Sequence, residues 1–167
     1  MPVIRKAAIQ PEHVKDRLPT AEDAFLICPL IGKVRTVLLS ALDREFEPFG
    51  ITGIQFGILK HVADGSARTA ADLCRLLHYD NSSMTRMIDR LEERAWLKRE
   101  RSKDDRRVVS LKLTAAGRAA ASRLRENATR VAQRMLGGFT AGEVEDLRRY
   151  LLRVIENDQP AAQGPQP

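Results

Sequence analysis

The sequence has few of the residues that most often carry catalysis, disulfides or cofactors. Its 167 residues include two cysteines, one tryptophan and three histidines (His13, His61 and His78). Two cysteines are too few for a disulfide scaffold, so we expect a protein of the reducing cytosol. The histidines are scattered, and the sequence has no Gly-rich phosphate loop, paired-carboxylate motif or zinc-protease motif. The sequence therefore argues against an enzyme and indicates no cofactor.

Long apolar runs are scarce as well. No uninterrupted run approaches the roughly 18 residues that a membrane span needs. The first 20 residues also lack the apolar core of a signal peptide. We therefore expect a soluble, cytoplasmic protein with no membrane partner.

Apolar material and positive charge are both plentiful. Hydrophobic residues make up 43% and charged residues 30% of the chain, which is typical of a packed globular fold. The formal net charge is +6, and the pI is about 9.7. This balance favours an acidic partner such as nucleic acid.

The two ends of the chain read as irregular segments around a helical body. Residues 1–20 carry three prolines and no periodic pattern, and residues 158–167 are rich in Pro, Gln and Ala. After a capping pattern at Thr20 and Asp23, apolar residues follow at helical spacing until Pro48. Pro29 should kink this helix or mark a fresh start. Its wide apolar face holds Leu30, Ile31, Val34, Val37, Leu38, Ala41, Leu42 and Phe46.

The middle of the chain predicts a helix-turn-helix. After a helix at about 53–64, Thr69 begins a short helix to Leu77, and a brief turn leads to another helix ending near Ala95. In that last helix the apolar positions Met84, Met87, Ile88 and Leu91 share one face. Small, polar and cationic residues occupy the other face, as a helix entering a major groove requires. They are Asn81, Ser82, Ser83, Thr85, Arg86, Asp89 and Arg90.

A charged hairpin follows directly. The stretch "WLKRERSKDDRRVVSLKL" reads as strand, turn and strand, with Val109, Leu111 and Leu113 alternating with polar residues. Residues 97–113 hold seven Lys or Arg against three Asp or Glu. A hairpin after a helix-turn-helix is the wing of a winged-helix domain.

Two further helices complete the predicted fold. Thr114 is placed to cap a long helix that ends at Gly137-Gly138. A capping box at Thr140 and Glu143 begins the last helix. That helix carries one apolar stripe, formed by Val144, Leu147, Leu151, Val154 and Ile155. The fold class is therefore mainly α with a small β-hairpin wing.

Several motifs in this order resemble the MarR family of bacterial transcription regulators. "MTRMIDRLEERAWLKRERSKDDRRVVSLKLTAAG" is similar to the family pattern of "TR…DRLE.RG", a wing with "DRR", and then "LT..G". The preceding "GITGIQFGIL" and "TAADLCRLL" match the two earlier helices. The resemblance covers roughly residues 22–157. One departure is Ala95-Trp96, where the family usually has Gly and an aliphatic residue.

The resemblance implies a domain organisation and a function. A winged helix-turn-helix at 51–113 would bind DNA. The segments 21–50 and 114–157 would form a helical dimerisation region, between the arm at 1–20 and the tail at 158–167. The protein would be a homodimeric repressor on a pseudo-palindromic operator in double-stranded DNA, released by a small-molecule effector. Apolar terminal helices agree with a dimer.

The resemblance also assigns DNA contacts. Asp105 would orient Arg107 into the minor groove, where a narrow groove attracts arginine. Arg86 is the candidate for guanine, since arginine can donate two hydrogen bonds to that base. Pairing of Arg86 and Arg90 with Asp89 or Glu93 is the alternative, and a solvated hairpin tip is the alternative for the wing. The remaining groove and phosphate candidates are Asn81, Ser82, Ser83, Thr85, Arg90, Lys103 and Arg106.

An effector pocket is the last site that the resemblance implies. An aromatic or phenolic acid would bind between the dimerisation helices and the winged helix, with Arg35 pairing its carboxylate. The alternative is that the phenylalanines are plain core. The expected lining is Arg35, Phe46, Phe49, Gln55, Phe56 and His61.

The two cysteines leave other interpretations open. Cys28 lies where peroxide-sensing relatives carry a reactive cysteine, so a thiol-based oxidant sensor is an alternative to a buried, unreactive thiol. Cys74 and His78 have the spacing of two metal ligands on a helix, but packing of Cys74 is the simpler interpretation, and we expect no metal site. A different alternative is a non-specific architectural DNA-binding protein.

Overall fold

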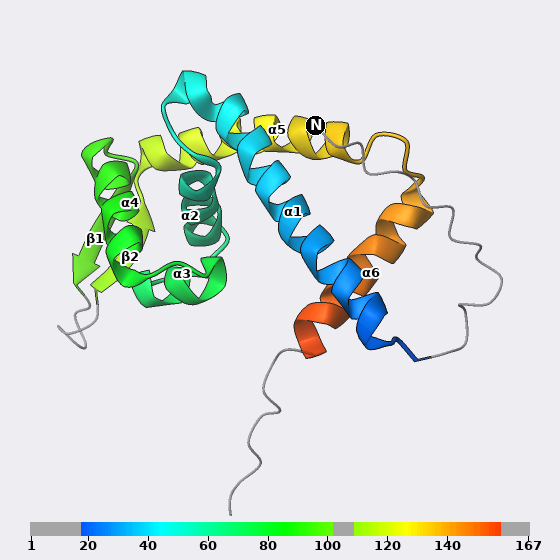
Figure 1. Cartoon of the computed structure of the whole chain (residues 1–167). Coiled ribbons are helices and arrows are strands. Elements are labelled where there is room, and N and C mark those ends of the chain that lie inside the picture. The colour runs from blue at the N-terminus through cyan, green and yellow to red at the C-terminus, as the bar shows by residue number, and fades with distance from the viewer. Residues whose placement is uncertain (1–17, 102–108, 158–167) are drawn as a thin grey trace, which may run out of the picture. The chain divides into compact units, whose positions relative to one another are not determined.

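The structure is a computed structural model that describes residues 18–101 and 109–157. The chain divides into two compact units, residues 1–37 and 38–167, and each is described by itself. The order of elements is α1 (Ala21–Phe46), the 3-10 turn η2 (Glu47–Phe49), α2 (Gly53–Ala63), α3 (Ala70–Leu77), α4 (Asn81–Glu93), β1 (Leu97–Arg101), β2 (Val109–Leu113), α5 (Ala115–Met135) and α6 (Ala141–Asn157) (Figure 1). The mainly helical fold with one hairpin is as predicted.

In the described residues, the N-terminal unit contains the first part of α1. Thr20 and Asp23 cap it reciprocally, with the Thr20 N–H donating to Asp23 Oδ2 over 2.8 Å. The helix continues through Pro29, which therefore marks no fresh start. By length and composition alone, the segment Ala21–Phe49 passes for a membrane span, which the count of uninterrupted apolar residues did not anticipate. One such helix is weak support for a membrane protein, because apolar helices of soluble proteins pass the same test.

Local capping determines where most helices of the second unit begin. The hydroxyls of Thr52 and Thr69 close capping boxes on α2 and α3, while Asp80 and Thr114 cap α4 and α5. Each cap satisfies backbone N–H groups that have no partner inside the helix. The predicted caps at Thr69, Thr114 and Thr140 are confirmed.

The core of the second unit lies between α2, α3, α4, the hairpin and α5. Its fully buried large side chains come from six elements, α1 included. They are Phe46, Ile58, Leu59, Leu73, Met84, Ile88, Leu91, Leu97, Leu124 and Val131. The predicted inward face of α4 is thus confirmed, with Met87 only partly buried.

The wing is a two-stranded antiparallel hairpin that is tied to the helices at its root. Leu97 pairs with Leu113, and Arg101 pairs with Val109. The Leu111 N–H also donates to the Arg68 carbonyl over 2.7 Å, which joins β2 to the segment before α3. The strand pattern predicted for 109–113 is confirmed.

Close contacts at the wing root depend on two unusual backbone positions. A Cβ on Gly117 would lie 1.8 Å from the Trp96 carbonyl oxygen, so only glycine fits there. Ala95 adopts a left-handed φ of 54°. Around it, the Trp96 N–H donates to the Leu91 carbonyl and the Ala95 N–H to the Glu92 carbonyl, which is the Schellman arrangement that usually takes glycine.

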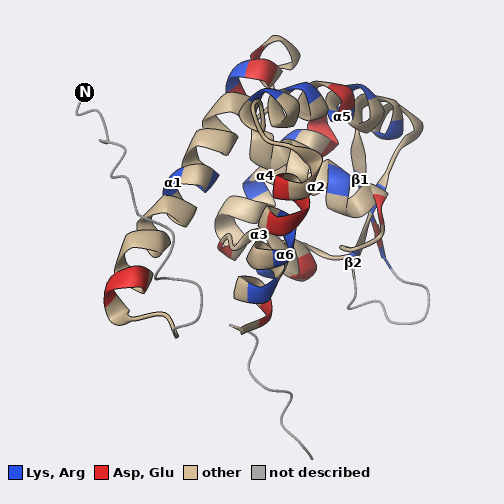
Figure 2. Cartoon of the chain, turned by 90° about the vertical axis from the view of Figure 1, so that its right-hand side faces the viewer, with Lys and Arg blue, Asp and Glu red and all other residues tan. Residues whose placement is uncertain are grey.

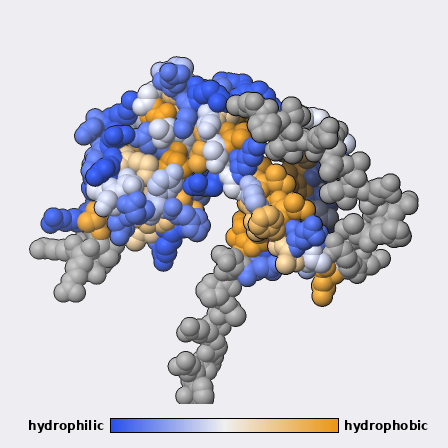
Figure 3. Space-filling view, in the orientation of Figure 1, coloured by the Kyte–Doolittle hydropathy of each residue, from blue (hydrophilic) through white to orange (hydrophobic). Residues whose placement is uncertain are grey.

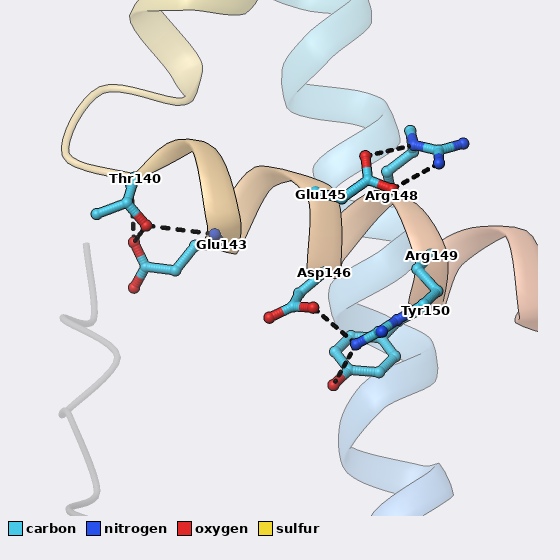
Figure 4. A network of polar contacts seen from close by, with 7 residues as sticks. All are labelled: Thr140, Glu143, Glu145, Asp146, Arg148, Arg149 and Tyr150. Atoms are coloured by element: carbon cyan, nitrogen blue, oxygen red, sulfur yellow. Dashed lines mark hydrogen bonds and ion pairs between the residues drawn. The ribbon is translucent and has the colours of Figure 1, made fainter.

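The polar side chains of the last helix, α6, pair with one another within the helix. Thr140 and Glu143 form its capping box, and Arg148 and Arg149 pair with Glu145 and Asp146 within the helix (Figure 4). No residue of α6 is buried. Its predicted apolar stripe therefore lies at the surface of the described chain, unlike the stripe of α4.

Candidate nucleic-acid interface

The recognition helix α4 presents the predicted polar face to solvent. Asn81, Ser82, Thr85, Arg86 and Arg90 are exposed, whereas Ser83 and Asp89 are half-buried. The opposite face is anchored in the core by three fully buried apolar side chains. Because one face is locked, the orientation of the other is determined, and small side chains at its N-terminal end leave room for a groove wall.

Two contacts define the start of this helix. The Asp80 carboxylate accepts a hydrogen bond from the Ser83 N–H over 2.8 Å, and that bond lowers the pKa of Asp80. The Cys74 thiol donates to Asn81 Oδ1 over 3.2 Å, so Cys74 holds the first residue of α4. His78, four residues after Cys74, takes a left-handed φ of 56° in the turn. Within the described residues no group of potential metal ligands gathers here.

Arg99 on β1 takes up the acidic groups of α4. Its guanidinium donates to Asp89 over 2.6 Å and to Glu92, and its backbone N–H donates to Glu92 over 3.2 Å. These bonds outweigh the desolvation that opposes them and raise the pKa of Arg99. Among the described residues, neither Arg86 nor Arg90 has a carboxylate within ion-pairing distance. The alternative in which these arginines pair with Asp89 or Glu93 therefore finds no support, and both cations face solvent.

The strands of the wing carry charges of both signs (Figure 2). Glu100 accepts from Lys98 over 2.5 Å and from Lys112 over 2.6 Å. These two ammonium groups, Lys112 first, lower the pKa of Glu100 to about 2. The predicted wing-tip residues lie outside the described residues: they are Lys103, Asp105, Arg106 and Arg107.

Several of the six residues predicted to line an effector pocket have other contacts in the described structure. Phe46 is fully buried, 5.2 Å from Phe56 between ring centroids, and is plain core. Gln55 is buried as the capping partner of Thr52, where its Oε1 accepts from the Thr52 N–H. His61 Nδ1 lies 2.8 Å from Ser66 Oγ, and burial lowers the pKa of the imidazole.

Phe49 and Arg35 complete that set. Phe49 is half-buried beneath the Arg123 guanidinium, which lies 6.0 Å from the ring centroid. Arg35 is exposed and belongs to the N-terminal unit. Cys28, in the same unit, is exposed and unpaired with any other cysteine, so the expectation that it is buried is wrong.

A cavity that the sequence did not predict lies where α2, β2 and α5 meet. Its volume is about 810 Å³, and Phe56 is the one residue it shares with the predicted lining. Apolar groups from all three elements line it together with Lys60, Lys112, Arg118 and Arg125, and Asp64 is the one carboxylate among the described lining residues. Residues so far apart in sequence cannot be grouped by motif spacing, so no sequence signal identified this site.

These features define a winged-helix DNA-binding protein. The sequence matches the MarR family over residues 49–108. It is 30% identical to the HTH-type transcriptional regulator PecS of Dickeya dadantii over 135 residues, covering 79% of this chain and 81% of PecS. It is also 30% identical to the multiple antibiotic resistance protein MarR of Escherichia coli, covering 68% and 80% of the two chains.

A solved structure gives the same result. A cysteine-to-serine variant of E. coli MarR in complex with operator DNA is 28% identical, with a TM-score of 0.70, over 82% of this chain and 99% of that chain. The chain belongs to the MarR family of winged-helix transcriptional regulators. It is a DNA-binding regulator of transcription and not an enzyme.

Proposed function

We propose that the protein is a cytoplasmic repressor that binds a pseudo-palindromic operator as a homodimer and is released by a small organic anion. The proposal that α4 reads DNA rests on one observation: Arg86 and Arg90 lie on its exposed face and have no carboxylate partner among the described residues. Arg86 would read guanine, and the wing, through Arg107 with Asp105, would enter the minor groove. A dimer seated on an operator represses because it excludes other proteins from that stretch of DNA.

Exposed apolar side chains on two helices support the homodimer. Of the 17 large hydrophobic side chains that are exposed in the described residues, seven lie on α1 and six on α6. Figure 3 shows such apolar surface in orange. An exposed apolar stripe along a helix marks an interaction site. A second copy of the chain, which carries the same stripes, is the occupant that we propose.

The cavity between α2, β2 and α5 supports the effector. Its apolar lining residues suit a ring, and its cationic lining residues suit a carboxylate or phenolate. Arg118 donates to the Leu113 carbonyl over 2.9 Å, and Lys112 is paired with Glu100, so both are engaged. Arg125 has no carboxylate partner among the described residues and is the candidate anion receptor. A ligand here would touch β2 and could release DNA only by favouring the arrangement that binds DNA less well.

Operator binding is tested by selection of bound duplexes from a random pool, followed by affinity measurement against random DNA. We expect a preference of about 10³ or more for the selected pseudo-palindrome. Arg86→Ala should reduce that preference at one base position per half-site, and Arg107→Ala should weaken binding with the dimer intact. A preference well below 10³ would instead favour the architectural interpretation.

Effector binding is tested with benzoate as the probe. We expect benzoate to raise the melting temperature and to weaken operator binding, and we expect Arg125→Gln to reduce both effects. Arg134→Gln, which removes an exposed arginine further along α5, is the matched control. If peroxide releases operator and Cys28→Ala abolishes that release while benzoate has no effect, the oxidant-sensing alternative is correct.

A further inference from the structure

Arg94 makes a two-pronged contact across a long stretch of sequence. It is the residue at the C-terminal end of α4, and its Nη1–H and Nη2–H donate to the carbonyls of Phe49 and Gly50, each over 2.8 Å. Its guanidinium also lies 5.3 Å from the Trp96 ring centroid. The side chain thus joins the end of the recognition helix to a segment more than 40 residues earlier.

That earlier segment is the corner at which α1 ends and α2 is about to begin. Gly50 has a left-handed φ of 62°, and its N–H donates to the Glu47 carbonyl over 2.9 Å. A Cβ on Gly50 would lie 2.6 Å from Arg94 Nη2, so the corner and the guanidinium fit closely. Arg123 of α5 covers the Phe49 ring in the same corner. The corner therefore meets both α4 and α5.

We propose that Arg94 is a positioning residue that sets the orientation of the recognition helix relative to the α1–α2 corner. A planar guanidinium that donates to two successive carbonyls constrains angle as well as distance, which a single ammonium cannot do. The buried face of α4 maintains the fold without Arg94, because Met84, Ile88 and Leu91 are fully buried. What Arg94 adds is a precise orientation of α4 for reading DNA.

This inference rests on the proposed dimer. It concerns the separation at which the winged helix-turn-helix domains of the two subunits bind their half-sites. In a dimer joined through the apolar stripes of α1 and α6, the corner at the end of α1 links the interface to the winged helix-turn-helix, which we call the head. With Arg94 in place, each head follows its corner, so the dimer accepts one half-site separation. Without it, each head can rotate, and operators of altered separation should bind more nearly as well.

The test compares operators of different half-site separation in the full-length dimer. Affinities are measured for the selected operator, for operators lengthened or shortened by about one or two base pairs, and for a single half-site. The wild type should discriminate among separations. Arg94→Ala should reduce that discrimination by about five-fold or more, which is the low end of coupling between sites, with half-site affinity nearly unchanged. Arg94→Lys should resemble Arg94→Ala.

The controls separate this inference from its foundation. Arg134→Ala removes the same charge from an exposed arginine and should leave the discrimination unchanged. If Arg94→Ala keeps the wild-type discrimination, or if half-site affinity and melting temperature fall together with it, the positioning role is refuted. If the wild type itself shows no operator preference over random duplex, the proposed function fails first.

Discussion

The recognition helix α4 and the last helix α6 have similar sequence patterns, but the apolar stripe of α4 is buried and that of α6 is exposed. Both carry an apolar stripe at helical spacing, and both start at a side-chain cap. Yet Ile88 of α4 is fully buried, whereas Ile155 of α6 is 59% exposed. An amphipathic pattern specifies that a face will be covered, but it does not say by what. In α4 the chain itself covers the face, and in α6 we propose that a second copy does.

The largest expected effect on stability comes from replacing a glycine in the first turn of a helix with alanine, which we compare between α5 and α6. Gly117→Ala would place a Cβ 1.8 Å from the Trp96 carbonyl oxygen, so α5 and the wing root must separate. We expect a loss of about 3 kcal/mol in the free energy of unfolding, measured by urea denaturation. Gly142→Ala, near the start of α6, meets no atom closer than 4.0 Å and should gain up to about 1 kcal/mol from helix propensity. Equal effects at the two sites would refute the contrast.

The second prediction tests the exposed apolar stripe of α6. Leu151→Lys places a charge on the exposed stripe of α6, where it would have to be buried in the dimer. We expect the dimer dissociation constant to rise by about 30-fold or more, which corresponds to about 2 kcal/mol for a central interface residue. Light scattering over a concentration series measures it, with Arg153→Ala on the same helix as control. An unchanged dimer would show that α6 is not at the interface.

The third prediction concerns the link between wing and recognition helix. Arg99→Gln leaves Asp89 and Glu92 without their cation next to the proposed DNA surface, so operator affinity should fall by about ten-fold, or about 1.4 kcal/mol. Asp89→Asn in the Arg99→Gln background should recover part of that loss, because it removes an uncompensated charge. A double-mutant cycle on operator affinity measures the coupling, and strictly additive effects would contradict the arrangement.

The fourth prediction is a substitution that stabilises the C-terminal end of α4. Ala95 pays for a left-handed conformation that glycine adopts without strain, so Ala95→Gly should raise the free energy of unfolding by about 0.5–1 kcal/mol. The gain is smaller than the strain itself because glycine also loses more entropy on folding. Thermal melts read it out, with Ala119→Gly inside α5 expected to destabilise. A loss of stability in Ala95→Gly would mean that the methyl group is needed at the wing root.

The smallest effect is on the pH dependence of the wing. The pKa of Glu100 is lowered from 4.5 to about 2 by Lys112 and Lys98, so its stabilising contribution is fully present above pH 4.5 and is lost as the pH falls through about 2. Side-chain NMR titration should therefore give a midpoint well below that of a free glutamate. Replacing Lys112 with Gln should move the midpoint upward, and an ordinary midpoint in the wild type would contradict the ion pairs.

Much of the fold could be predicted because its signals are local. Thr69, Thr114 and Thr140 act as caps through residues three positions away, and the inward face of α4 follows from a period of 3.6 residues. The pocket was harder, because Lys60 and Arg125 are brought together only by packing of α2 on α5. Phe46 and Gln55, which seemed available for a ligand, are used by the core and by a helix cap.

The sequence by itself determined the element types, their boundaries, the polar face of α4 and the family motifs, because each depends on neighbours within a few positions. Only the tertiary structure decided which acidic groups Arg99 takes from α4, which carbonyls Arg94 binds and which stripe is left uncovered. Those outcomes depend on residues that are distant along the chain, and their partners are chosen by packing, not by spacing. The free arginines of α4 are therefore a property of the fold, although the arginines themselves are visible in the sequence.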